Sequence, residues 1–198
     1  MEKKRELTKN FWITWILIFL LLIIASAVGF GLFSNREEEV IVNDENGGDV
    51  VLNYSSDFPG IIIKNAVPTT DAVGMKKMED GDYFDFSVET ILDNARSVEY
   101  ELSLVKDKKL SNIPDEDIRI YLEKENSGTY SAVFEPKGFT PLKKDSKYGS
   151  KTGDMVLTKE KKTRKSTDLY RLRIWLRDQS TVVNGNYSVE VVVSGISK

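Results

Sequence analysis

The sequence predicts a mainly β protein, an antiparallel β-sandwich preceded by one N-terminal transmembrane helix. Two observations carry this prediction. Residues 11–33 are an apolar run of 23 residues without a charged side chain. The chain after this run alternates apolar and polar residues with a period of two and has almost no helical periodicity. That alternation is typical of strands with one buried and one solvated face.

The apolar run is long enough to cross a bilayer. At about 1.5 Å per residue, a helix of this length reaches roughly 34 Å, and the hydrocarbon core is about 30 Å thick. Four basic residues precede the run within residues 1–10, whereas glutamates occupy positions 37–39 behind it. Because basic residues stay on the cytoplasmic side, we expect a cytoplasmic tail at 1–10, a single transmembrane helix at 11–33 and an extracytoplasmic remainder.

A cleaved signal peptide is the alternative interpretation of this N-terminal segment. Ala25-Ser26-Ala27 is an A-x-A sequence that follows a basic start and an apolar stretch, as at a signal cleavage site. Cleavage after Ala27 would leave Val28 as the new N-terminus, with the apolar run continuing to residue 33. The continuing run favours the uncleaved anchor. Both interpretations export the rest of the chain.

Composition excludes several classes of function. The chain has a net charge of −3 at pH 7, which suits nucleic acid poorly because that binding depends on basic residues releasing counterions. It has no histidine, which removes imidazole-based triads and His-ligated zinc sites. It also has no cysteine, which fits export across a single bacterial membrane. We therefore expect no enzyme and no cofactor, with carboxylate or Ser–Lys catalysis as the remaining enzymatic alternative.

Three acidic clusters are the candidates for a calcium site. Calcium takes six to eight oxygen ligands, and none of the clusters matches the calcium-loop pattern D-x-[DN]-x-[DN]-G-x₅-E. We interpret them as acidic turns without a metal; they are Asp44, Asn46 and Asp49, then Glu79, Asp80 and Asp82, then Asp115, Glu116 and Asp117.

Five segments alternate clearly and are expected as strands, at 82–90, 98–104, 118–124, 170–176 and 187–195. Shorter candidates are 40–42, 50–54, 60–65, 130–134 and 155–159. Strands of this kind pack as two sheets in a jelly-roll or Ig-like sandwich, which we place at residues 39–198 after a linker at 34–38. Residues 66–78 are expected as a short helix or irregular loop, 135–153 as a long loop, and the charged run 159–165 as a solvated loop.

Four passages together resemble a known family: VPTTDAVG (67–74), YFDFSVET (83–90), YRLRIWL (170–176) and NYSVEVVVSG (186–195). In order and spacing they are similar to membrane-tethered β-sandwich proteins related to the camelysin and biofilm-fibre group of Gram-positive bacteria. The resemblance implies a jelly-roll-like domain on the cell surface, in some members assembling into fibres by strand exchange. The metalloprotease activity described for camelysin is not carried over, because this chain has no histidine to bind zinc.

The candidate ligand-binding residues lie on one face of the segment 170–176 and its next residue. Tyr170, Leu172, Ile174 and Leu176 are expected to point inward, which leaves Arg171, Arg173, Trp175 and Arg177 on the opposite face. Guanidinium groups and an indole there would suit anionic or sugar ligands. The alternative is an ordinary exposed sheet face, with the arginines paired to Glu190, Glu99 or Glu101. On either interpretation, Arg173→Asp should be tolerated, whereas aspartate at Ile174 or Val191 should unfold the domain.

The sequence thus predicts a non-enzymatic, membrane-anchored surface protein. Its β-sandwich would serve protein–protein interaction or assembly, with the membrane and either itself or another envelope protein as partners and without nucleic acid. The alternative is a carbohydrate- or anion-binding envelope module that uses Arg171, Arg173, Trp175 and Arg177.

Overall fold

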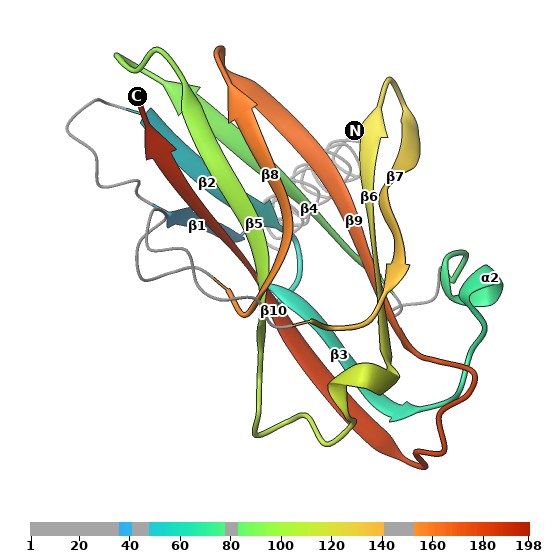
Figure 1. Cartoon of the computed structure of the whole chain (residues 1–198). Coiled ribbons are helices and arrows are strands. Elements are labelled where there is room, and N and C mark those ends of the chain that lie inside the picture. The colour runs from blue at the N-terminus through green and yellow to red at the C-terminus, as the bar shows by residue number, and fades with distance from the viewer. Residues whose placement is uncertain (1–35, 41–47, 78–82, 141–152) are drawn as a thin grey trace, which may run out of the picture. The chain divides into compact units, whose positions relative to one another are not determined.

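The computed structural model describes residues 36–40, 48–77, 83–140 and 153–198 (Figure 1). The chain divides into two units, Met1–Asn35 and Arg36–Lys198, and the second contains all the described residues. The expected tail and transmembrane helix lie outside them. Among the residues that are described, no helix has the length and apolar character needed to span a membrane.

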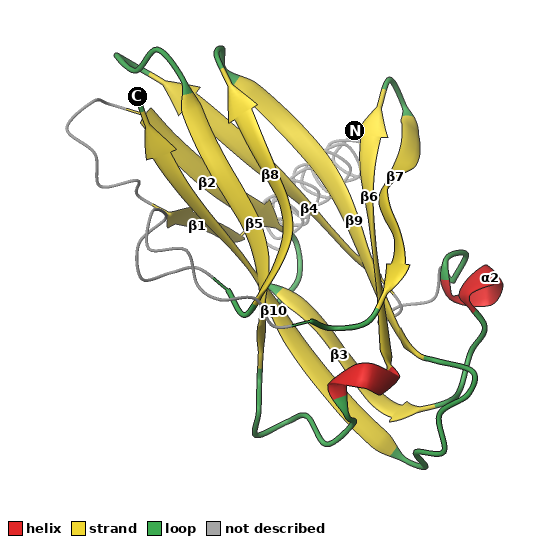
Figure 2. Cartoon of the chain, in the orientation of Figure 1, coloured by secondary structure: helices red, strands yellow, loops and turns green. Residues whose placement is uncertain are grey.

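The described residues form two antiparallel sheets, which confirms the mainly β prediction (Figure 2). The six-stranded sheet contains, in spatial order, β1 (Arg36–Val40), β2 (Gly48–Tyr54), β4 (Tyr83–Leu92), β9 (Ser166–Leu176), β6 (Ile118–Asn126) and β7 (Thr129–Lys137). The four-stranded sheet contains β3 (Gly60–Ala66), β10 (Gly185–Ser197), β5 (Val98–Lys106) and β8 (Met155–Lys162). Two short helices, α2 (Asp71–Gly74) and η1 (Asp115–Asp117), lie in the connections.

One hydrophobic core lies between the sheets, as in a β-sandwich. Both inner faces contribute to it, with Leu172 and Ile174 on β9 and Val189 and Val191 on β10 among its buried members. These residues are the ones that the alternation placed inward. The period-two pattern therefore identified the core-facing side of these strands, because successive side chains of a strand point to opposite faces.

The boundaries of several strands differ from those expected. β1 begins at Arg36 and pairs in register with β2, so strand structure starts inside the expected linker at 34–38. β7 continues to Lys137, into the loop expected from residue 135. Pairing with a neighbouring strand supplies the hydrogen bonds that allow these polar residues to remain extended.

The charged run at 159–165 is only partly a loop, because its first four residues belong to β8. A register shift between Leu102 and Ser103 places Glu160 opposite Tyr100. Cross-strand partners share a face of the sheet, so Glu160 points toward the other sheet, while Lys159 and Lys161 are exposed. A run of charges can therefore continue a strand when its inward members meet opposite charges.

Candidate functional site

The face of β9 that carries the predicted ligand residues is covered by the chain itself. Trp175 is only 2% exposed and Arg173 only 4%, so the expectation of an exposed sheet face is wrong for both. Trp175 is covered by the one-turn helix α2, in which Gly74 lies so close to the indole that a Cβ there would be 2.3 Å from the ring. Asp71 of the same helix accepts a hydrogen bond from the Trp175 Nε1 (3.2 Å).

Each of the three guanidinium groups has a carboxylate partner near β9. The closest nitrogen–oxygen distances join Arg171 to Asp85 (2.6 Å), Arg173 to Glu123 (3.2 Å) and Arg177 to Asp117 (2.7 Å). These partners come from β4, β6 and η1, whereas the expected Glu99, Glu101 and Glu190 lie on β5 and β10 of the other sheet. The sequence alone could not say which strands would be neighbours.

Arg171 has the most complete set of contacts on this face. Its Nε and a terminal nitrogen donate to both carboxylate oxygens of Asp85, and its guanidinium carbon lies 4.7 Å from the Tyr83 ring centroid and 4.5 Å from that of Tyr130. The hydrogen bond to Asp85 raises the pKa of Arg171 above its usual range. A ligand on this face would have to displace these internal contacts, so the geometry favours a structural role.

Gly74→Val tests how tightly α2 covers Trp175. The indole is held by Asp71, so the valine side chain would force helix and ring apart, and we expect a loss of about 1–3 kcal/mol in the free energy of unfolding. Urea denaturation measures it. Gly138→Val is the matched control, because the nearest atom to a Cβ there is 3.7 Å away. Equal losses in the two variants would show that α2 is not packed as described.

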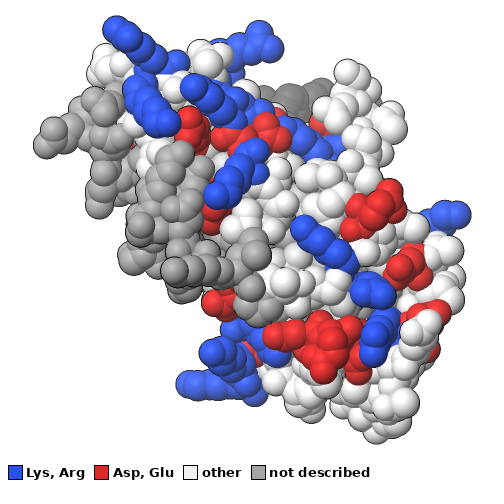
Figure 3. Space-filling view, in the orientation of Figure 1, with Lys and Arg blue, Asp and Glu red and all other residues white. Residues whose placement is uncertain are grey.

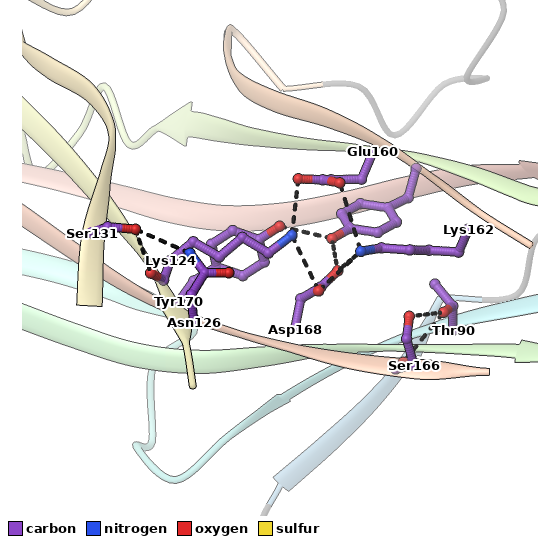
Figure 4. Close-up of polar contacts among 10 residues, drawn as sticks. Thr90, Lys124, Asn126, Ser131, Glu160, Lys162, Ser166, Asp168 and Tyr170 are labelled. Carbon is purple, nitrogen blue, oxygen red and sulfur yellow. Dashed lines mark hydrogen bonds and ion pairs between the residues drawn. The ribbon is translucent and has the colours of Figure 1, made fainter. Parts of the chain in front are cut away.

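A second polar cluster, which the sequence analysis missed, lies between the two sheets (Figure 4). Asp168 on β9 is its centre. This carboxylate accepts a hydrogen bond from the Tyr100 hydroxyl (2.6 Å), lies 2.7 Å from the Lys162 Nζ and lies 3.1 Å from the Lys124 Nζ. We call Tyr100, Lys124, Glu160, Lys162, Asp168 and Tyr170 the inter-sheet network.

The inter-sheet network joins four strands from both sheets. Lys124 of β6 reaches across to Glu160 of β8 (2.9 Å), and the Tyr100 hydroxyl of β5 lies 2.8 Å from that of Tyr170 on β9. Two ammonium groups are balanced by two carboxylates. These contacts form a charge-neutral link between the two sheets, at the end of the sandwich where β8 connects to β9.

The ionised groups of the network are stabilised in their charged forms. Burial alone would raise the pKa of Asp168, but hydrogen bonds from Lys162, Tyr100 and Lys124 outweigh it and hold the pKa below its usual range. Burial would lower the pKa of Lys124, but the hydrogen bond to Glu160 and the nearby Asp168 raise it above its usual range. Both groups are therefore charged throughout the neutral range.

The pKa values of the two tyrosines also shift away from neutrality. Burial raises the pKa of Tyr170 to about 12, and burial together with Tyr170 and Asp168 raises that of Tyr100 further. A general acid or base works best with a pKa near the operating pH, and the shifts of these four groups move them away from it. The inter-sheet network is thus suited to holding the sheets together and poorly suited to transferring protons.

The alternating pattern of the sequence contains a signal that could have identified two members of this network. The inward phase of 170–176, continued by one step toward the N-terminus, reaches Asp168, and the inward phase of 118–122, continued by one step, reaches Lys124. Charged residues at inward positions are rare unless they are paired. Besides each other, their partners come from β5 and β8, which the local pattern does not identify.

The acidic clusters have other partners where they can be described. Asp115 pairs with Lys106 and accepts a hydrogen bond from the Tyr187 hydroxyl (2.8 Å), and Asp117 pairs with Arg177. Within 36–40, 48–77, 83–140 and 153–198, no three acidic side chains are grouped to hold a metal ion. The clusters at 44–49 and 79–82 fall almost entirely outside the described residues.

The sequence matches no protein-family model, and no curated protein is detectably similar to it. The function of the domain is therefore inferred from its own residues and geometry.

Proposed function

We propose that this chain is a non-enzymatic surface protein, held in the membrane by residues 11–33 and presenting its β-sandwich outside for protein–protein interaction or assembly. The uncharged 23-residue run, with basic residues before it and acidic residues after it, is the observation that carries the proposal. The inter-sheet network supports the non-enzymatic part, since the pKa values of its members Tyr100, Lys124, Asp168 and Tyr170 are displaced away from neutrality.

The strand order supports a jelly-roll arrangement over an Ig-like one. Without β1 and β2, the eight strands from β3 to β10 form two four-stranded sheets, in the orders β3-β10-β5-β8 and β4-β9-β6-β7. First and last strands adjoin in one sheet, and the second and next-to-last adjoin in the other, as in double-sheet jelly rolls. This order agrees with what the resemblance to the camelysin and biofilm-fibre group implies.

The edge strand β7 is the best candidate for the contact with a partner. Edge strands present unpaired backbone groups that accept another strand, and charged side chains usually protect them. β1, at the other edge of the same sheet, has the sequence REEEV, and β8 carries four lysines or glutamates at positions 159–162. β3, the fourth edge strand, has the sequence GIIIKNA with one lysine, whereas β7 has no charge over the six residues from Thr129 to Phe134. We propose a second copy of the chain or another envelope protein as the partner.

Site-specific photo-cross-linking on intact cells tests this proposal. A photoreactive amino acid at Ser131 of β7 should give a light-dependent adduct with the chain itself or with an envelope protein, identified by mass spectrometry. Thr167 is the control, because it is also exposed but lies on β9, inside the sheet.

The same sample tests the anchor through its N-terminal peptide. Mass spectrometry should find residues before the apolar run in the membrane fraction. A mature N-terminus at Val28 would overturn the anchor, and equal adducts from Ser131 and Thr167, or none from Ser131, would overturn β7 as the contact edge.

A further inference from the structure

Exposed aliphatic side chains gather at one end of the sandwich. Among the described residues, five large hydrophobic side chains are exposed, and four of them lie in the β3–β4, β5–β6 and β9–β10 connections. Val183 is 80% exposed, Val67 72% and Leu110 50%. We call the end formed by these three connections the loop end; it is the lower end in Figure 1.

Backbone contacts tie the three connections to one another. Ala66 at the end of β3 pairs with Gly185 at the start of β10. The Asn112 N–H in the β5–β6 connection donates to the Asn186 carbonyl (3.0 Å), and the Arg177 N–H donates to the Asp117 carbonyl (2.8 Å). The exposed aliphatic side chains are thus displayed on a connected surface.

The turn that contains Leu110 is held by hydrogen bonds and also contains two lysines. The Asp107 carboxylate accepts hydrogen bonds from the N–H groups of Lys109 (2.8 Å) and Leu110 (3.2 Å). This holds Lys108, Lys109 and Leu110 together at an exposed tip. Among the described residues, neither lysine ammonium forms an ion pair with a carboxylate.

Three aspartates of the loop end are paired within the domain. Asp115 pairs with Lys106 and accepts a hydrogen bond from Tyr187. Asp117 pairs with Arg177 and accepts a hydrogen bond from Ser180. Asp71 accepts a hydrogen bond from Trp175 and pairs with Arg119. Glu116 and Asp178 stay exposed, so the positive charge is local to the 108–110 turn. In the view of Figure 3, the lowest part of this end carries no charged side chain, basic side chains lie to its left, and acidic side chains lie directly above it.

We propose that the loop end rests on the lipid bilayer, with Leu110, Val67 and Val183 in the interfacial layer and Lys108 and Lys109 on lipid phosphates. Aliphatic tips flanked by lysines are the combination that binds anionic membrane surfaces. The inference rests on the anchor proposed above, because a tether confines the domain beside the bilayer and raises the effective concentration of so small a contact. The charge complementarity of lysines and phosphates favours lipid over a second copy of the chain.

Single cysteines test the contact, since the chain has none of its own. The full chain is reconstituted into phosphatidylcholine vesicles, with and without phosphatidylglycerol, as Leu110→Cys, Val183→Cys or Leu169→Cys labelled with an environment-sensitive dye. Leu169 is the matched control, because it is 43% exposed but lies on β9, outside the loop end. Brominated lipids should quench the dye at 110 and 183 at least about twofold more than at 169, and Lys108→Glu with Lys109→Glu should remove the dependence on phosphatidylglycerol.

The outcomes separate this inference from the anchor. Extraction of the vesicles at alkaline pH reports the anchor, because a transmembrane chain stays with the lipid whether or not the loop end touches it. A retained chain with equal quenching at all three positions would overturn the lipid contact alone. Energy transfer between dyes on different copies, without quenching by brominated lipid, would assign the loop end to a second copy and also overturn it.

Discussion

Replacing Asp168 with alanine should lower the free energy of unfolding by about 3 kcal/mol, because it leaves charged groups between the sheets without their partner. Asp168 contacts Tyr100, Lys124 and Lys162. Lys124 keeps Glu160, so the loss should fall at the lower end of what breaking a buried ion pair costs. Urea denaturation of the full chain in mild detergent, followed by circular dichroism, measures the change.

Asp85→Ala is the matched control for this substitution. It also removes an aspartate bound to a basic residue, but Asp85 is exposed, so its loss should cost about 1 kcal/mol, clearly less than the loss of Asp168. Similar losses of stability in the two variants would contradict the role of the inter-sheet network in holding the sheets together.

The pH dependence of the Asp168 effect follows from its lowered pKa. A carboxyl with a lowered pKa in the folded state stabilises the fold above the unfolded pKa, about 3.9, and loses this contribution as the pH falls through the folded value. Lys124, with a raised pKa, contributes below about pH 10.4 and loses its contribution as the pH rises further. The difference between wild type and Asp168→Ala should therefore be constant from about pH 5 to 9 and shrink below about pH 4. A difference unchanged down to pH 2 would contradict the assignment.

Arg173→Asp should destabilise the domain by about 4 kcal/mol, in contrast to the tolerance expected from the sequence. Arg173 is buried, and its guanidinium contacts Glu123 (3.2 Å) and donates to the Lys77 carbonyl. The substitution would place two carboxylates against each other and leave that carbonyl without its donor. The same denaturation experiment measures the loss.

Two further variants separate burial from charge. Arg164→Asp lies on an exposed turn and should change stability by less than about 0.5 kcal/mol. Combining Arg173→Asp with Glu123→Arg restores opposite charges and should recover part of the loss, as a double-mutant cycle would show. If Arg173→Asp is as mild as Arg164→Asp, then Arg173 is not buried and paired as described.

The alternation of the sequence identified the strands and their inward faces correctly because a period of two is a local property of extended backbone. Leu172, Ile174 and Val191 are buried as expected. The same alternation also places Asp168 and Lys124 at inward positions. A charged residue at such a position can be interpreted only when its partner is known, and the alternation does not identify the partner. The membrane run at 11–33 is equally local, and it stays a prediction.

Tertiary structure alone decided which outward side chains are covered and which charges meet. Trp175 and Arg173 follow the outward phase of β9, yet both are buried. The helix α2, about a hundred positions earlier in the chain, packs over Trp175, and Lys77, shortly after α2, accepts a hydrogen bond from Arg173. Asp168 finds its partners on strands of both sheets, brought within reach by the strand order and by the register shift between β5 and β8. The sequence by itself determined the fold class and the core-facing sides of the strands, since those depend on residues close together in the chain. The polar clusters depend on contacts between distant segments, which only the folded chain specifies.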